Sequence, residues 1–111
     1  MIEFEKLTNG QGSLLMYLET RAVDFAGRVN GPHMNADDFA DAALLDKEGV
    51  IKFGRICSNH VTSDGANWVE LLDPAWEYVA KLRRAKAVRM FTARQWMSTA
   101  EKRAAEMEDA E

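Results

Sequence analysis

The architecture predicted for this chain rests on residues 47–84, which read KEGVIKFGRICSNHVTSDGANWVELLDPAWEYVAKLRR. Val50–Ile56 is apolar and β-branched with polar residues interleaved, a pattern that predicts a half-buried strand. Residues 57–67 are rich in Ser, Asn, Asp and Gly and predict a loop. Trp68–Leu71 predicts a second strand. The two strands therefore form a hairpin, which must pack on helices because an isolated hairpin is only marginally stable.

A long helix is expected after the hairpin. Asp73 is placed to cap its N-terminus, and Pro74 suits the first helical position. Neither Gly nor Pro follows Pro74, so this helix is predicted to run to about Met107. The side chains expected to pack into the body around this corner are Trp68, Trp76, Val79 and Leu82.

Two helices are expected before the hairpin. Residues 1–12 are predicted to be a lead-in that ends in a turn at Asn9-Gly10-Gln11-Gly12, with Ser13 capping a helix from Leu14 to about Val29. Asn35 is predicted to cap a second helix over Ala36–Lys47. The side chains that we expect this second helix to bury are Phe39, Ala40, Ala43 and Leu44, with Leu45 as a further candidate.

These elements define an α+β fold that is mainly α, with two N-terminal helices, a β-hairpin and a long C-terminal helix. The predicted organisation is a lead-in at 1–12, a compact domain at 13–86 and the distal part of the C-terminal helix at 87–111. A chain of 111 residues is long enough for one core.

The composition limits the cellular compartments in which we expect this protein. The chain has no run of 18 apolar residues, so we expect no membrane partner. The N-terminal residues are acidic where a secretion signal would be basic. The single cysteine excludes an intramolecular disulfide and suits a reducing compartment, so a cytoplasmic location is expected.

Charge is distributed unevenly along the chain. Residues 1–80 hold 6 Lys/Arg and 13 Asp/Glu, net −7, whereas residues 81–103 hold 8 Lys/Arg and one acid, net +7. Residues 104–111 add four acids and no base. The pattern indicates an acidic body, a basic helical stretch and an acidic tip.

Two motifs carry a resemblance to a known family. Leu45-Asp46-Lys47-Glu48-Gly49-Val50-Ile51 resembles the junction between the third helix and the first wing strand of winged-helix domains. Residues 69–76, VELLDPAW, resemble the second wing strand and the following helix cap of winged-helix regulators of the MarR and PadR type. The resemblance covers about residues 36–86. It implies a winged-helix-like fold and a dimeric DNA-binding regulator with a long dimerisation helix.

The chain departs from that family at one place. Between Gly31 and Gly49 it has room for one good helix or two very short ones, where a winged helix-turn-helix needs two. The segment that would read DNA, Asn35–Lys47, is rich in Asp, and phosphate contacts dominate DNA affinity. The resemblance to the family fold therefore does not imply that this segment reads bases in the major groove.

Basic residues supply the candidate binding site for nucleic acid or for an acidic partner. Two lie on the predicted wing, where His60 could extend the surface, and five lie on the C-terminal helix. These residues are Lys52, Arg55, Lys81, Arg83, Arg84, Lys86 and Arg89. Alternative interpretations are a solvated helix face, phosphate binding, and docking on an acidic protein surface such as a second copy.

Large apolar side chains on the distal helix supply a second candidate site. Phe91, Trp96 and Met97 lie past the point where a small body could cover them, so we expect a dimer or partner interface there. The alternative is a helix that bends back and buries Trp96 within its own chain.

Catalytic motifs are sparse. Cys57 and His60 form C-x-x-H without a second ligand pair, and no Gly-rich phosphate loop follows a strand. We expect no enzyme, no metal and no cofactor. Two function classes stay open. The first is a small winged-helix nucleic-acid-binding regulator acting as a dimer. The second is a phage or mobile-element interaction or inhibitor module, which could imitate DNA and would bind a host protein complex.

Overall fold

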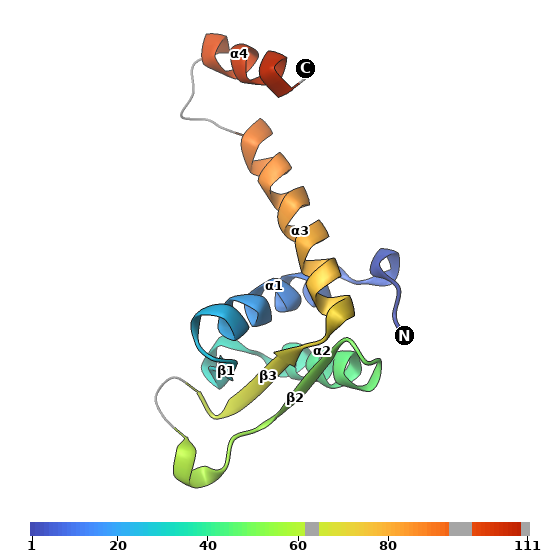
Figure 1. Cartoon of the computed structure of the whole chain (residues 1–111), viewed down its shortest axis with the longest axis vertical. Helices are drawn as coiled ribbons and strands as arrows, with labels where there is room; N and C mark the ends of the chain where they lie inside the picture. The colour runs from blue at the N-terminus through green and yellow to red at the C-terminus, as the bar shows by residue number, and fades with distance from the viewer. Residues whose placement is uncertain (62–64, 94–98, 110–111) are drawn as a thin grey trace.

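A computed structural model describes residues 1–61, 65–93 and 99–109 of the chain (Figure 1). The fold is α+β and mainly α, as the sequence predicts. The helices are α1 (Asn9–Asp24), α2 (Ala36–Lys47), α3 (Asp73–Thr92) and α4 (Thr99–Asp109). The strands are β1 (Arg28–Val29), β2 (Ile51–Arg55) and β3 (Asn67–Leu71). Three 3-10 turns complete the order: η1 (Phe4–Lys6), η2 (Gly31–His33) and η3 (Ser58–His60).

The strands form one antiparallel sheet in the order β1-β3-β2. Ile51 pairs with Leu71 and Arg55 with Asn67, so the predicted hairpin is confirmed. β1, which the sequence analysis assigned to a helix, adds a third strand on the other edge of β3. A helix, a short strand, a turn, a second helix and then a hairpin is a winged-helix-like arrangement, in which β2 and β3 form the wing. Between Gly31 and Gly49 the chain forms the short turn η2 and one full helix, α2, in agreement with the expected room for one good helix.

The core lies between the helices and the inward face of the sheet. Its fully buried side chains come from α1 (Leu15, Leu18), α2 (Leu45) and the strands with their flanks (Val29, Val50, Ile51). α3 adds Ala75, Tyr78 and Val79. The Tyr78 hydroxyl donates a hydrogen bond to the carbonyl oxygen of Ile2 at 2.7 Å, which fastens the N-terminal segment to α3.

α1 begins earlier and ends earlier than predicted. Thr8, not Ser13, is its N-cap: the Thr8 hydroxyl accepts from Gln11 N, and the Gln11 side chain accepts from Thr8 N. The residues expected to form a turn therefore lie in the first helical turn. The helix ends at Asp24 because Ala26 and Gly27 adopt positive φ angles of 55° and 82°, which turn the chain into β1.

α2 has the predicted bounds and the predicted cap, Asn35, but buries a different face. Ala42 and Leu45 are buried, whereas Phe39, Ala40, Ala43 and Leu44 are exposed. The expectation that these four are core residues was wrong. Polar contacts to α1 and β2 orient this helix, and the spacing of its apolar residues does not predict those contacts.

The C-terminal region also differs from expectation. α3 begins at Asp73 with Leu72 as its N-cap, and it ends at Thr92, so α3 is not a single helix reaching Met107. α4 follows as a separate helix, turned away from the axis of α3 (Figure 1). Trp68 and Trp76 were expected in the core but are 38% and 44% exposed. Val79 is buried and Leu82 is half-buried, as predicted.

Gly27→Ala tests the turn between α1 and β1. A methyl group there would lie 2.7 Å from the carbonyl oxygen of Val69, and the φ angle is positive. We expect the free energy of unfolding to fall by about 1–3 kcal/mol, the cost of a strained backbone position. The measurement is urea unfolding followed by circular dichroism.

Gly10→Ala is the matched control for that variant. Gly10 is exposed in the first turn of α1, and its nearest neighbour would be 3.7 Å from the added methyl group. Stability should stay the same or rise by up to ~1 kcal/mol, since alanine is the better helix former. Equal destabilisation by both substitutions would contradict the role given to Gly27.

Candidate functional site

The outward face of the three-stranded sheet is the first candidate site. Side chains alternate along β3, so Val69 and Leu71 point into the core while Trp68 and Glu70 point outward. Across the ladders, Lys52 pairs with Glu70, Gly54 pairs with Trp68 from β2, and Arg28 pairs with Trp68 from β1. Lys52, Trp68 and Glu70 are exposed and Arg28 is half-buried, so this face meets solvent.

Trp68 lies over the backbone of Gly54. A Cβ atom added at Gly54 would stand only 2.7–2.8 Å from Cζ2, Cε2 and Nε1 of the indole. Any side chain at position 54 would therefore displace the ring. Glycine here allows the indole to lie against the sheet, and 38% of Trp68 stays exposed.

Arg28, Lys52 and the carboxylate of Glu70 lie on the same face of the sheet as Trp68. Arg28 Nη1 donates to the carbonyl oxygen of His60 at 3.0 Å, which joins β1 to the turn at the end of the wing. Lys52 lies on the same face as Trp68, two positions from Gly54. Arg55 is exposed one position past Gly54, and by strand alternation it lies on the opposite face of the hairpin. The predicted pair Lys52 and Arg55 is thus split between the two faces of the wing.

The charges of the body are segregated between its helices and its strands. Residues 25–35 and 51–61, which contain β1 and β2, hold Arg28, Lys52 and Arg55 and no Asp or Glu. β3 adds Glu70. α2 with its C-cap, residues 36–48, holds five acids and Lys47. The sheet is therefore locally cationic in a chain whose net charge is −4.

Four of the five acids in residues 36–48 have structural partners. Asp38 accepts from Asn35 N at 3.0 Å within the capping box, and Asp41 accepts from Gln11 Nε2 at 3.3 Å. Asp46 accepts from Phe53 N at 2.9 Å. Glu48 lies 3.4 Å from the N-terminal ammonium group. These contacts orient α2 against α1 and β2, and they explain why acids are concentrated in this helix.

The exposed face of α2 is largely apolar as a result. It carries Ala36, Asp37, Phe39, Ala40, Ala43, Leu44, Asp46 and Lys47. Direct reading of bases relies mainly on Arg, Lys, Asn, Gln, Asp or Glu at the edges of the base pairs. Of these types the exposed face of α2 offers Lys47, Asp37 and Asp46, and Asp46 already accepts from Phe53 N.

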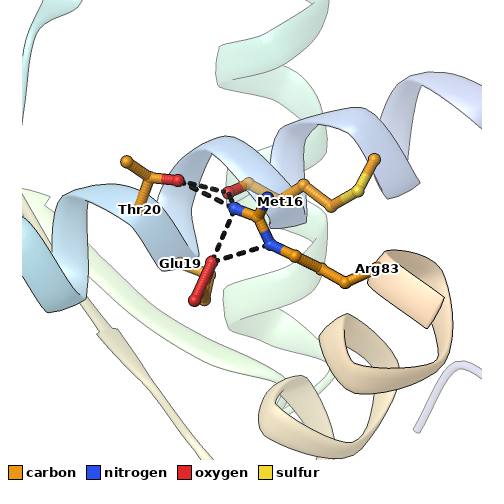
Figure 2. Close-up of polar contacts among 4 residues, drawn as sticks. All are labelled: Met16, Glu19, Thr20 and Arg83. Atoms are coloured by element: carbon orange, nitrogen blue, oxygen red, sulfur yellow. Dashed lines mark hydrogen bonds and ion pairs between the residues drawn. The ribbon is translucent and has the colours of Figure 1, made fainter. Parts of the chain in front are cut away.

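Arg83 is engaged within its own chain (Figure 2). Its Nη2 atom donates to Glu19 Oε2 at 2.7 Å, to Thr20 Oγ1 at 2.9 Å and to the carbonyl oxygen of Met16 at 3.2 Å. Its Nε atom donates to the same Glu19 oxygen at 3.0 Å. The Arg83 side chain is 43% exposed, but its guanidinium is held by four hydrogen bonds that fasten α3 to α1, a contact that the sequence did not predict.

The other predicted cations of α3 lie on its surface. Lys81 Nζ stands 5.0 Å above the centre of the Phe4 ring, a cation–π contact. Arg84, Lys86 and Arg89 are exposed on the distal half of the helix. That half rises away from the body at the end of the molecule opposite to the wing tip (Figure 1). The structure therefore does not join the wing cations and the α3 cations into one surface.

The predicted dimer residues fall partly within the described chain. Phe91 is half-buried and lines a hollow of about 440 Å³ between α3 and α4, together with Arg84, Ala87, Val88, Thr92 and Glu106. Val88 and Met90 on the same half of α3 are 57% and 63% exposed. Trp96 and Met97 lie outside the described residues.

The described ranges hold neither a cluster of metal ligands nor a membrane-spanning helix. Within 1–61, 65–93 and 99–109, no three His, Cys, Asp or Glu side chains converge as metal ligands. Cys57 is exposed at the start of η3. In the same part of the chain, no helix combines the length and apolarity needed to cross a bilayer.

Comparison with known proteins returned no family model, no curated protein and no solved structure that matches the chain.

Two residues of the outward sheet face were not among the predicted site residues. Trp68 was assigned to the core, although strict alternation from the buried Val69 and Leu71 would have placed it outside with Glu70. Arg28 was assigned to a helix, because the positive φ angles that end α1 fall partly on an alanine. Gly54 pairs with Trp68 because of the register between β2 and β3. The sequence did not predict this register, because it does not fix the length of the loop between the two strands.

Arg83→Ala tests the contact between α1 and α3. We expect a loss of about 1 kcal/mol of stability, because the ion pair is partly exposed and its net contribution is correspondingly small. Arg84→Ala, one residue further on the exposed side, should stay within about 0.5 kcal/mol of wild type. Thermal or urea unfolding gives both values, and equal effects would argue against the contact.

Proposed function

We propose that this chain is a small nucleic-acid-binding protein of winged-helix type, without catalytic activity, that acts in the cytoplasm as a regulator. The observation that carries the proposal is the solvent-facing sheet, whose strands hold Arg28, Lys52 and Arg55 against one acid, Glu70, in a chain of net charge −4. Winged-helix topology presents its hairpin to the nucleic-acid backbone, and phosphate contacts supply most of the affinity in such complexes.

The wing binds phosphates from both of its faces in this proposal. Lys52 and Arg28 serve the outward face of the sheet, and Arg55 serves the opposite face near the tip. α2 contributes little reading of bases, since Lys47 is the one basic residue on its exposed face and most of the other exposed residues are apolar. The expected behaviour is binding that depends strongly on salt and weakly on sequence.

Salt dependence tests the wing. Each phosphate contact removed from a duplex complex should flatten the slope of log affinity against log salt by roughly 0.9. Lys52→Ala with Arg55→Ala should therefore flatten it by up to about twice that amount. The measurement is a fluorescence anisotropy titration of labelled duplex between about 50 and 200 mM salt, where phosphate contacts lose most affinity.

Lys86→Ala with Arg89→Ala is the matched control, because it removes two exposed cations at the other end of the molecule. This second pair should leave the salt slope unchanged. If only the α3 pair weakens binding, the α3 cations and not the wing contact phosphate. Absence of binding to any nucleic acid at the lower salt would remove the proposal.

A protein-interaction module is the second candidate, favoured by the exposed apolar side chains of the distal half of α3. Val88 and Met90 are more than half exposed beside the hollow that Phe91 lines. Exposed apolar surface of this kind marks interfaces. A second copy of the chain is the partner proposed for this face, and the basic α3 residues would then meet the acidic helices of that copy.

Val88→Ser with Met90→Ser tests that interface. If the distal half of α3 joins two copies, these changes should shift the mass in light scattering from that of a dimer to that of a monomer, with helix content unchanged. Phe39→Ser, an exposed apolar residue on α2, is the control and should leave the mass unchanged. A wild-type protein that is monomeric at micromolar concentration would exclude self-association.

A further inference from the structure

We infer that the exposed face of Trp68 is a stacking platform for an unpaired nucleobase, so that the outward face of the wing sheet binds single-stranded nucleic acid. The inference rests on the proposed function and narrows it, because it names the residue that holds the base and the form of nucleic acid that is bound. DNA and RNA share this chemistry, and the experiment below separates them.

The position of the Trp68 ring on the sheet is the first observation that supports the inference. The indole lies over Gly54, where an added Cβ atom would come within 2.7–2.8 Å of three ring atoms. One side of the ring is thereby shielded by the sheet while 38% of the side chain remains exposed. A smaller aromatic side chain would be enough to cover the glycine and stabilise the sheet. Tryptophan adds the largest π-surface on which a base can stack.

The charges around the ring are the second support. Arg28 pairs with Trp68 from β1, and Lys52 lies on the other side of the ring, two positions before Gly54 on β2. Residues two apart on a strand are separated by about 7 Å on the same face. A base stacked on the indole would thus have a cation on either side for its flanking phosphates, which is the combination that single-strand binding uses.

The chemistry of stacking indicates the selectivity. A base stacked on the exposed side of the indole is held through its π-face, which every base has. A duplex hides those faces in its own stack, so an unpaired strand gains a contact that a duplex cannot make.

The test compares three labelled probes with wild-type and variant protein in anisotropy titrations. The probes are oligo-dU and oligo-U of about a dozen nucleotides, within the span of known single-strand sites, and a hairpin duplex of the same charge. We expect wild type to bind the single strands more tightly than the duplex. Equal affinity for oligo-dU and oligo-U would indicate a shared site, and a difference identifies the preferred sugar, because these two probes differ in the sugar alone.

Trp68→Leu should weaken single-strand binding by about 5- to 150-fold, the equivalent of ~1–3 kcal/mol for one stacked base. Trp68→Phe should retain most of the affinity because it keeps an aromatic face. Trp76→Leu is the matched control, since Trp76 is equally exposed but lies on α3, and it should bind like wild type. Circular dichroism checks that each variant is folded.

A second readout does not depend on a variant of Trp68. With Trp76 and Trp96 changed to Phe, Trp68 is the remaining tryptophan, and stacking of a base should quench its fluorescence as binding saturates. Binding without quenching would overturn the platform, and so would wild-type affinity in the Trp68→Leu variant. In either case the Lys52→Ala variant still tests whether the wing contacts phosphate. Failure of every probe to bind overturns the platform and the proposed function together.

Discussion

The pairing of β3 with a strand on each of its edges is the constraint on which the rest of the structure depends. Val69 N donates to the carbonyl oxygen of Gly27 at 2.8 Å on one edge, while the ladder to β2 runs from Leu71 to Asn67 on the other. This central position fixes which side chains enter the core. Val69 and Leu71 face the helices, so Trp68 and Glu70 must face solvent, since neighbouring residues on a strand alternate.

Polar contacts between elements set the orientation of the helices around that sheet. Asp41 accepts from Gln11 of α1 and Asp46 accepts from the backbone N–H of Phe53 in β2, so two acids of α2 hold this helix against its neighbours. Arg83 similarly fastens α3 to α1. An excess of acid on α2 is therefore a consequence of how the helix is held, and by itself it is a poor guide to what the helix contacts.

The proposed binding of a polyanion relies on the cations of two strands. β1 and β2 carry Arg28, Lys52 and Arg55, whereas α2 is rich in acids. Interactions between exposed charges are screened over about 10 Å at moderate salt, so the charges nearest to a bound strand would matter more than the net charge of the chain. The distal half of α3 is a second, separate cationic element, better placed for contact with another protein surface.

The sequence by itself determined the hairpin, the extent and cap of α2, and the mainly helical class, because β-branched alternation, Asn35 and turn residues act locally. It also contained the capping box of Thr8 and Gln11, which the neighbouring glycines obscured. The tertiary structure alone decided β1, the buried face of α2 and the partner of Arg83. Each depends on residues distant in the chain: β1 exists through β3, α2 turns on contacts to Gln11 and Phe53, and Arg83 meets Glu19, 64 positions away. The position of Trp68 depends on both the sequence and the tertiary structure. Strand alternation places its side chain outward, and strand register places it over Gly54.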